Sequence, residues 1–255
     1  MSAIMTDRVQ RSFSRSFHSY HDTAGQQADI ANQLAARLVD LGAPSRFSQL
    51  FEFGCGTGHL TKALYRSFAI DNAILNDLTP EAGQTATEYG AQFLLGDIRH
   101  VTWPVKSDLI ASSSTIQWLE KPEAVLSAAA RNLTPGGWLA VSGFGCDQYR
   151  ELAELGSDAR APGLRDADEL ARAVTTADGR MEIVELWQER RKLWFDTPHH
   201  VLRHLRSTGV NGRASRVWTR ATLASFSDSY SRAYATPEGV CLTYHPIWVI
   251  ARKRD

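Results

Sequence analysis

The chain has 255 residues and a mass of 28.3 kDa, enough for one α/β domain with a full core and an insertion. Its 28 Lys and Arg balance its 28 Asp and Glu, so no overall field draws it to nucleic acid or to a membrane. Its three cysteines are far apart and lack C-x-x-C spacing, and no apolar run suits a membrane span or a signal peptide. We expect a cytoplasmic monomer without a disulfide framework or a zinc site.

Two helices are predicted ahead of the first strand, and they form an N-terminal arm over residues 1–45. Residues 8–20 carry aromatic side chains at spacings of four and three, the last of them Tyr20. Residues 22–41 repeat isoleucine and leucine at helical spacing, and Gly42 follows as a helix-ending residue.

A glycine-rich turn at residues 49–60, QLFEFGCGTGHL, organises the rest of the chain. Its apolar run predicts a buried strand, and Gly54, Gly56 and Gly58 let the backbone approach a ligand before a helix begins. A dinucleotide fingerprint would need its third glycine at position 59, where this chain has His59. The turn favours a different cofactor, and the alternative is an ordinary strand–helix connection.

Asp77 ends a second predicted strand and lies 19 positions after Gly58. Nucleotide-binding α/β folds place a carboxylate roughly 20 residues beyond the glycines, where it accepts hydrogen bonds from ribose hydroxyls. The alternative is a helix cap, because Thr79 and Pro80 look like a helix start.

Strands and helices continue to alternate as far as residue 144, which is the signature of a parallel, doubly wound α/β sheet. A third strand ends at Asp97, and a fourth runs into a serine cluster that includes Ser113 and Ser114. Ligands bind outside the carboxyl ends of such strands, so these residues are expected to face a ligand. The serines lack a G-x-S-x-G context, which argues against a serine nucleophile.

The pattern changes after the fifth strand. We expect a polar loop at 156–168 and one long strand at 181–195, which extends beyond the sheet. Helices at 197–212 and 219–234 precede a closing strand at 241–253 and are expected to form a lid over the cofactor end. The chain is then one domain with four parts: the arm (1–45), a core (46–195), the lid (196–238) and the closing strand (239–255).

Four motifs resemble those of the class I S-adenosylmethionine (SAM) methyltransferases: E-x-G-x-G-x-G at 52–58, NDLTP at 76–80, GDI at 96–98 and LTPGG at 133–137. The resemblance implies a Rossmann-like, mostly parallel seven-stranded sheet with helices on both faces, SAM as cofactor and no metal. In that family the glycine turn wraps the amino-acid part of SAM. An acid after the third strand meets the adenine amino group, although Asp97 also suits a simple turn. The cofactor residues implied are Tyr20, Gln26, Glu52, Gly54, Cys55, Gly56, Gly58, Asp77, Leu78, Asp97, Ile98, Ser113 and Ser114.

A narrower resemblance is to the BioC family, the malonyl-acyl carrier protein O-methyltransferases of biotin synthesis. It rests on the F-x-x-x-F-x-x-Y arm, the NDL string, VLRHLRSTGVNG at 201–212 and LTYHPIWVIARK at 242–253. It implies transfer of the SAM methyl group to the free carboxylate of malonyl-acyl carrier protein, which masks a charge on a pimeloyl precursor. A carboxyl group of pKa about 4 is ionised near neutral pH, so positioning suffices and no catalytic base is required.

The implied acceptor needs cationic or hydrogen-bonding side chains. Candidates for the malonyl carboxylate are Arg150, Arg203, Arg206 and His204, although exposed arginines commonly only solvate a surface. Because acyl carrier proteins are acidic, a basic docking patch is expected over Arg190, Arg191, Lys192, His199, His200, Arg203, His204 and Arg206. His200 and His204 also have the spacing of a metal pair, but no third ligand is suitably spaced.

Two other functions stay open. One keeps the SAM fold with another acceptor, either a different small carboxylate or a ubiquinone-type carbon centre with His204 as base. The other is a non-catalytic SAM-binding regulator, which would bind SAM without methyl transfer. The sequence also leaves open whether acyl carrier protein or coenzyme A carries the malonyl group.

Overall fold

The computed structural model describes residues 25–157, 160–207 and 219–255. They fall into two compact units. The sheet unit consists of 25–145, 162–188 and 246–255, and the described part of the insertion unit comes from 146–161 and 189–245. The predicted helix at 8–20, with Tyr20, lies outside the described residues. Within the described ranges, no helix combines the length and apolar character needed to cross a membrane.

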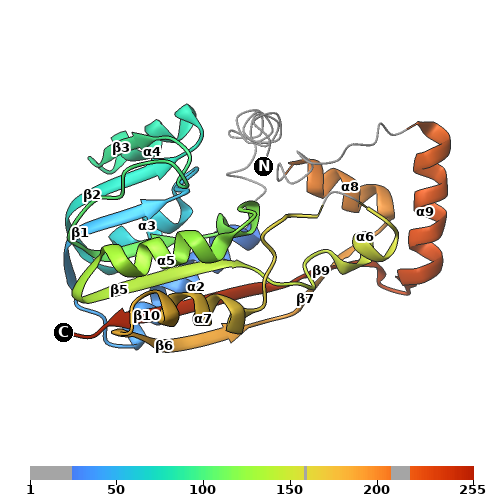
Figure 1. Ribbon diagram of the computed structural model, residues 1–255. Helices are drawn as coiled ribbons and strands as arrows, with labels where there is room; N and C mark the ends of the chain where they lie inside the picture. The colour runs from blue at the N-terminus through green and yellow to red at the C-terminus, as the bar shows by residue number, and fades with distance from the viewer. Residues whose placement is uncertain (1–24, 158–159, 208–218) are drawn as a thin grey trace. The chain divides into compact units, whose positions relative to one another are not determined.

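The sheet unit is built on a seven-stranded, mostly parallel sheet, as predicted (Figure 1). The strand order is β3-β2-β1-β4-β5-β10-β6, and only β10 runs antiparallel to its neighbours. The strands are β1 (Arg46–Phe53), β2 (Ala69–Asp77), β3 (Gln92–Leu95), β4 (Ser107–Ser112), β5 (Leu133–Phe144), β6 (Met181–Gln188) and β10 (Pro246–Lys253). Because β1 to β5 are parallel, their carboxyl ends meet at one edge of the sheet.

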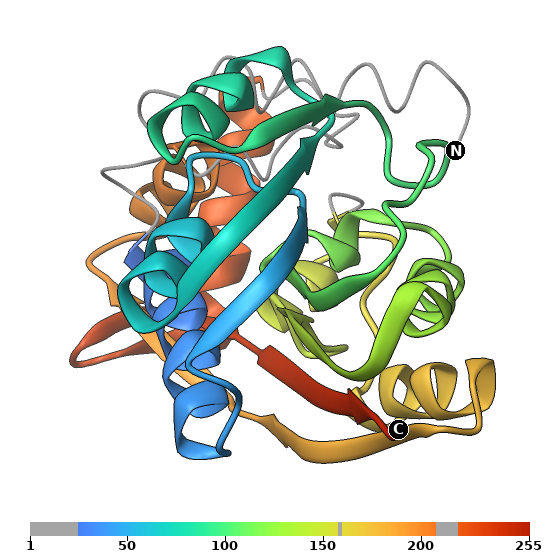
Figure 2. The ribbon, with the colours of Figure 1, turned by 90° about the vertical axis from the view of Figure 1, so that its left-hand side faces the viewer.

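Helices cover both faces of this sheet (Figure 2). One face carries α2 (Gly25–Asp40) and α3 (His59–Ser67), and the other carries α5 (Pro122–Asn132) and α7 (Ala167–Ala177). The shorter elements are η1 (Pro80–Ala82), α4 (Gly83–Glu88) and η2 (Ile116–Trp118). Helix α2 buries an isoleucine and leucine stripe completely, and the indole Nε1 of Trp248 in β10 donates to the carbonyl of Ile30 at 3.1 Å. The later helix of the predicted arm is thus part of the sheet unit.

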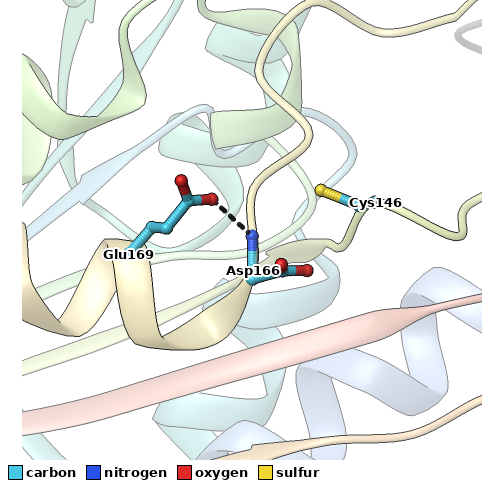
Figure 3. A group of neighbouring side chains, drawn as sticks. All are labelled: Cys146, Asp166 and Glu169. Carbon is cyan, nitrogen blue, oxygen red and sulfur yellow. Dashed lines mark hydrogen bonds between the residues drawn. The ribbon is translucent and has the colours of Figure 1, made fainter.

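Helix α7 was missed from the sequence. Its start shows a capping box, in which the backbone N–H of Asp166 donates to Glu169 Oε2 at 3.0 Å (Figure 3). The string Asp166-x-x-Glu169 was a readable signal for a helix, but the polar residues before it favoured a loop. The helix buries Leu170 and Val174 in the main core.

A buried lysine joins the end of β10 to neighbouring elements. Lys253 is 2% exposed, and its Nζ lies 2.8 Å from Asp178 Oδ2. The same ammonium donates to the carbonyls of Ala130 and Leu133, both at 3.0 Å. A buried cation is tolerated here because it has a charged partner and further acceptors.

The insertion unit contains a three-stranded antiparallel sheet that the sequence did not predict. Its order is β7-β9-β8; along the described part of this unit, one helix precedes these strands and two helices lie between β7 and β8. The elements are α6 (Arg150–Glu154), β7 (Arg191–Phe195), α8 (Pro198–Ser207), α9 (Arg220–Tyr234), β8 (Ala235–Thr236) and β9 (Gly239–Tyr244). Helices α8 and α9 lie between β6 and β10 in the chain, where the lid helices were predicted. The end of the predicted helix at 197–212 lies outside the described residues.

Two predicted strands were wrong in their extent. Residues 181–195 form β6 and β7, and residues 241–253 form β9 and β10, each pair divided between different sheets. The apolar pattern continues across both breaks, so periodicity alone did not show them. Pro246 was the available signal, because proline lacks an N–H and is tolerated at the first position of a strand.

Candidate active site

The glycine turn after β1 adopts a backbone that ordinary residues avoid. Gly54, Gly56 and Gly58 have φ angles of 68°, 49° and 81°. A Cβ on Gly54 would lie 2.0 Å from Thr115 Oγ1, and one on Gly58 would lie 2.7 Å from Thr85 Cγ2. Positions 54 and 58 therefore need glycine for both conformation and space, whereas Gly56 faces open space.

Asp77 ties the end of β2 to this turn. Its Oδ2 accepts from the N–H of Gly56 at 2.9 Å, and its Oδ1 accepts from the N–H and hydroxyl of Thr79 at 2.8 and 2.7 Å. Burial raises the pKa of Asp77, while these hydrogen bonds act in the opposite direction. The backbone N–H of Leu78 also hydrogen-bonds this carboxylate. The capping role is present, and the ribose role stays a prediction.

Glu52 lies behind the turn. Its side chain is buried, and Oε2 accepts from the hydroxyl of Thr61 on α3 at 2.8 Å. Burial raises the pKa of Glu52 to about 8, the Thr61 hydrogen bond lowers it, and nearby Asp77 raises it. Cys55 is also buried, and desolvation raises its thiol pKa well above the usual value. These two predicted cofactor residues thus support the turn from within.

The segment after β3 holds an ion pair. Asp97 Oδ1 accepts from the backbone N–H and the Nε of Arg99 at 3.0 and 2.9 Å. Partial burial raises the pKa of Asp97, but the hydrogen bonds and charge of Arg99 outweigh it and lower the pKa. Ile98 is 5% exposed, and Leu78 after β2 is partly exposed. Arg99 was not predicted from the sequence.

The serine segment after β4 is tied to β5 and to the glycine turn. The hydroxyl of Ser142 donates to Ser113 Oγ at 2.8 Å, and the Ser114 N–H donates to the Ser142 carbonyl at 3.1 Å. Ser114 has a φ of 55°, which is strained for a non-glycine residue. The hydroxyl of Thr115 donates to the Gly54 carbonyl at 3.3 Å. Thr115 also belongs to this site, as does Gln117, which lies in the segment after β4 that was expected to face the cofactor and the substrate.

Several buried polar atoms of the sheet unit have no hydrogen-bond partner among the described residues. Those on α2, in the glycine turn and after β4 include Gln26 Oε1, Thr57 Oγ1, Ser114 Oγ and Gln117 Oε1. Such an atom costs about 1–3 kcal/mol, so groups of this kind indicate a missing polar ligand. SAM carries matching donors in its ammonium, ribose hydroxyls and adenine amino group. The residues therefore fit this cofactor.

In the insertion unit, the predicted basic patch divides into separate parts. Arg190 pairs with Asp147 at 2.6 Å, and the Arg191 Nε donates to Glu189 at 2.7 Å. Lys192 and Trp194 are exposed on one face of β7, because side chains alternate along the strand. Phe195, on the opposite face, contacts His204 of α8 with ring centroids 5.2 Å apart. The eight predicted residues thus do not form one continuous surface, and β7 presents Lys192 away from α8.

Helix α8 has an exposed stripe of three side chains, which we call the α8 stripe: His199, Arg203 and Arg206. They share one face because their spacings are four and three. The opposite face buries Val201 and Leu205. Within Pro198–Ser207 there is no acidic residue. The neighbouring His200 lies 3.3 Å from Asp196.

His204 ends a chain of hydrogen bonds. Gln148 Oε1 accepts from the His245 N–H at 2.7 Å, so its amide nitrogen is the group that hydrogen-bonds the Tyr149 hydroxyl. Tyr149 in turn bonds to Tyr244, whose hydroxyl lies 2.7 Å from His204 Nε2. Because a tyrosine hydroxyl both donates and accepts, the bond between Tyr244 and His204 suits either tautomer of the ring. Burial lowers the pKa of His204, which favours the neutral imidazole.

Arg150, at the start of α6, lies beside a buried acid. The Nε of Arg150 is 3.8 Å from Glu151 Oε1, and Glu151 is 0% exposed. Glu151 Oε2 accepts from the Thr243 N–H at 2.9 Å, and Oε1 accepts from the Thr243 hydroxyl. The arginine itself remains largely exposed.

Comparisons with known proteins agree with this geometry. Residues 51–141 match the family model described as a methyltransferase domain. A solved putative methyltransferase from Bacillus halodurans covers 87% of this chain and 99% of its own, with a TM-score of 0.62 and 15% identity. The N-methyltransferase NodS from Bradyrhizobium japonicum, solved with S-adenosylhomocysteine, covers 97% and 100% with a TM-score of 0.56 and 14% identity. The fold and the glycine-turn site define a Rossmann-like class I methyltransferase.

Curated relatives narrow the class to one family. A protein of Prosthecochloris aestuarii is 37% identical over 96% of this chain and 92% of its own. One of Acinetobacter baylyi is 33% identical over 96% of both chains, and one of Haemophilus influenzae is 33% identical over 99% and 96%. All three are named malonyl-acyl-carrier protein O-methyltransferase. The chain belongs to this family of malonyl-acyl-carrier protein O-methyltransferases.

Proposed function

We propose that the chain transfers the methyl group of SAM to the free carboxylate of malonyl-acyl carrier protein. The observation that carries this proposal is the similarity to the named relatives over 96% of the chain, because it includes the insertion unit as well as the cofactor site. The product ester suits a primer of pimeloyl synthesis on the route to biotin. We place the enzyme in the cytoplasm, as a monomer.

The chemistry asks mainly for positioning. When bound, SAM supplies an electrophilic methyl group on a sulfonium. The malonyl carboxylate is ionised near neutral pH, so the chain's residues have to bind and orient it without removing a proton. The glycine turn and Asp77 are proposed to hold the cofactor, together with the predicted residues Tyr20, Gln26, Leu78, Asp97, Ile98, Ser113 and Ser114.

Arg150, Arg203 and Arg206 remain the candidates for the acceptor. Arg150 is the one of these anchored beside a buried carboxylate, and we assign it to the malonyl carboxylate. The α8 stripe is assigned to the acidic carrier protein, because it is exposed and carries no acid. The planar guanidinium of one arginine can hydrogen-bond both oxygens of a carboxylate, whereas several basic side chains along a helix can contact a broader acidic protein surface.

The central experiment supplies labelled SAM to the purified protein with malonyl-acyl carrier protein, acetyl-acyl carrier protein or malonyl-coenzyme A. We expect label on malonyl-acyl carrier protein and none on the acetyl form, which lacks the free carboxylate. Transfer to neither malonyl carrier would overturn the proposal. Tight binding of S-adenosylhomocysteine without any transfer would instead support a regulator.

A second experiment tests the α8 stripe with the double variant Arg203→Glu, Arg206→Glu. We expect its KM for malonyl-acyl carrier protein to rise about tenfold or more, with kcat little changed, because carrier binding is weakened. Malonyl-pantetheine, which lacks the carrier protein, should be methylated as before. Lys192→Glu on β7 is the matched control and should change neither value more than about twofold. An equal loss with malonyl-pantetheine would show that these arginines hold the carboxylate itself.

One contact bears on carbon methylation with His204 as base. The Tyr244 hydroxyl lies 2.7 Å from Nε2 of His204, so that nitrogen already has a hydrogen-bond partner in the insertion unit. A general base needs a lone pair directed at the proton it removes, and we therefore favour the carboxylate acceptor. Carbon methylation would be favoured instead if His204→Gln abolished all transfer and the wild-type rate depended on one group with a histidine-like pKa.

A further inference from the structure

Gln117 has a buried amide oxygen whose direction is fixed. The residue lies in η2, just beyond β4, and is 4% exposed. Its Nε2 donates to the Ser114 carbonyl at 2.5 Å, so the amide nitrogen and oxygen cannot be interchanged without opposing two oxygens. Oε1 then has no hydrogen-bond partner among the described residues. An amide oxygen only accepts, so the missing group must be a donor.

A second unpaired atom comes from the same segment. Ser114 Oγ is buried without a partner, and Ser114 has the strained φ of 55° described above. The following residue borders the glycine turn, because Thr115 Oγ1 donates to the Gly54 carbonyl at 3.3 Å. Gly143 at the end of β5 makes room on the other side, where a Cβ would lie 2.5 Å from Ile116 Cγ1. The surrounding backbone thus holds this segment against the cofactor edge.

The order of the strands indicates which hydrogen-bond donor of SAM lies next to Gln117 and Ser114. SAM has three kinds of donor: the adenine amino group, the ribose hydroxyls and the α-ammonium. The candidates for adenosine, Asp97 and Asp77, follow β3 and β2, which lie on one side of β1. Gln117 and Ser114 follow β4, on the opposite side of β1. A cofactor lying across the end of β1 therefore directs its amino-acid part toward Gln117.

We propose that Gln117 Oε1, assisted by Ser114 Oγ, accepts hydrogen bonds from the α-ammonium of SAM. This inference rests on SAM being the cofactor and is independent of the acceptor. Gln117 and Ser114 would then select cofactors that carry an amino-acid group. The charge of the ammonium makes the bond to Gln117 stronger than one to a neutral donor.

The test compares two ligands by titration calorimetry. S-adenosylhomocysteine carries the ammonium, and 5′-methylthioadenosine keeps the adenosine but lacks the whole amino-acid group. Gln117→Met should weaken S-adenosylhomocysteine about tenfold or more, the usual effect of losing a hydrogen bond to a charged group, while 5′-methylthioadenosine binds within about twofold of wild type. Ser114→Ala should show the same selectivity with a smaller loss, and it serves if Gln117→Met fails to fold.

Three results would overturn the inference. Equal losses for both ligands would mean that Gln117 only supports the segment, and unchanged S-adenosylhomocysteine binding would place the ammonium elsewhere. An S-adenosylhomocysteine analogue that lacks the amino group but keeps the carboxylate should bind the wild type and Gln117→Met with the same affinity. A persistent difference in affinity would assign Gln117 to the carboxylate of the amino-acid part. If the wild type binds neither S-adenosylhomocysteine nor 5′-methylthioadenosine, the proposed function fails. If the wild type binds these ligands but transfers no methyl group to malonyl-acyl carrier protein, the comparison of the two ligands still tests Gln117.

Discussion

Glu52 gives the clearest pH signature of a single residue. Its pKa of about 8 lies above the ordinary 4.5, chiefly because the carboxyl group is buried. Between those values the folded state keeps a proton that the unfolded state has released, so stability falls as pH rises. We expect the free energy of unfolding to fall by up to about 1.4 kcal/mol per pH unit between pH 5 and 8. Denaturant unfolding across this range measures it.

The control for Glu52 is Glu52→Gln, which resembles the protonated acid and can still accept from Thr61. Its stability should lack this part of the pH dependence, so the wild-type and variant curves should converge toward acidic pH. Parallel curves from pH 5 to 8 would show that Glu52 is ionised in the folded protein.

Gly54 and Gly56 form a matched pair within the glycine turn. Both have positive φ, but a Cβ at position 54 meets Thr115 at 2.0 Å and one at position 56 meets nothing within 4 Å. Gly54→Ala should therefore lower S-adenosylhomocysteine affinity and stability much more than Gly56→Ala, whose cost is about 1–2 kcal/mol of strain. Calorimetry and thermal unfolding of the two variants measure the difference. Equal effects would mean that conformation alone, and not the approach of Thr115, requires glycine.

At the scale of elements, Lys253 links β10 to the end of α5, the start of β5 and the residue after α7. Replacing it by Met leaves the carbonyls of Ala130 and Leu133 without this donor, while Asp178 keeps Arg180 as a partner. We expect Lys253→Met to lower the free energy of unfolding by about 1–3 kcal/mol, because buried acceptors lose their hydrogen bonds. The exposed neighbour Arg252, changed to Met, should cost under about 1 kcal/mol. Urea unfolding distinguishes the two, and a similar small loss for both would mean that Lys253 is readily replaced.

The sequence was sufficient for the elements whose signals are local. Alternating strands and helices predicted a parallel, doubly wound sheet, and Gly54, Gly56 and Gly58 predicted the turn at its edge. The number of seven strands came from the resemblance to class I methyltransferases. The three-stranded sheet escaped because β7 and β9 are brought together by residues about 50 positions apart, and no local pattern encodes that pairing. Gln117 was expected in the segment that faces the cofactor, but its individual role was not predicted. Its importance depends on the orientation of one amide, which is set by the carbonyl of Ser114.

The insertion unit shows the same limit at longer range. The series of hydrogen bonds from Gln148 to His204 joins residues from three separate stretches of the sequence: 148–149, 204 and 244–245. The sequence marked His204 as a possible base or metal ligand but did not show that Tyr244 contacts its Nε2. Strand alternation on β7 and the pairing of Arg190 with Asp147 separate members of the predicted basic patch, and neither is visible in a run of basic residues in the sequence.

At the scale of the whole molecule, the balanced charge makes a prediction about salt. With 28 charges of each sign, long-range attraction for an acidic partner has to come from a local group such as the α8 stripe. The Debye length falls from about 10 Å at 0.1 M salt to about 3 Å at 1 M. We expect kcat/KM for malonyl-acyl carrier protein to fall severalfold over this range, and that for malonyl-pantetheine to change little. A similar response of both substrates would contradict docking through the stripe.

The pairing of β10 with β6 has a consequence for changes in the segment between them. Ile247 is opposite Gln188, so the chain leaves the sheet unit and re-enters it at adjacent positions of one antiparallel ladder. Residues 189–245 thus occupy the place of a hairpin turn. Because the antiparallel ladder closes at this pair, the register of β6 and β10 does not depend on the length of the segment between them. A change in this segment therefore need not alter the strands that carry the cofactor site.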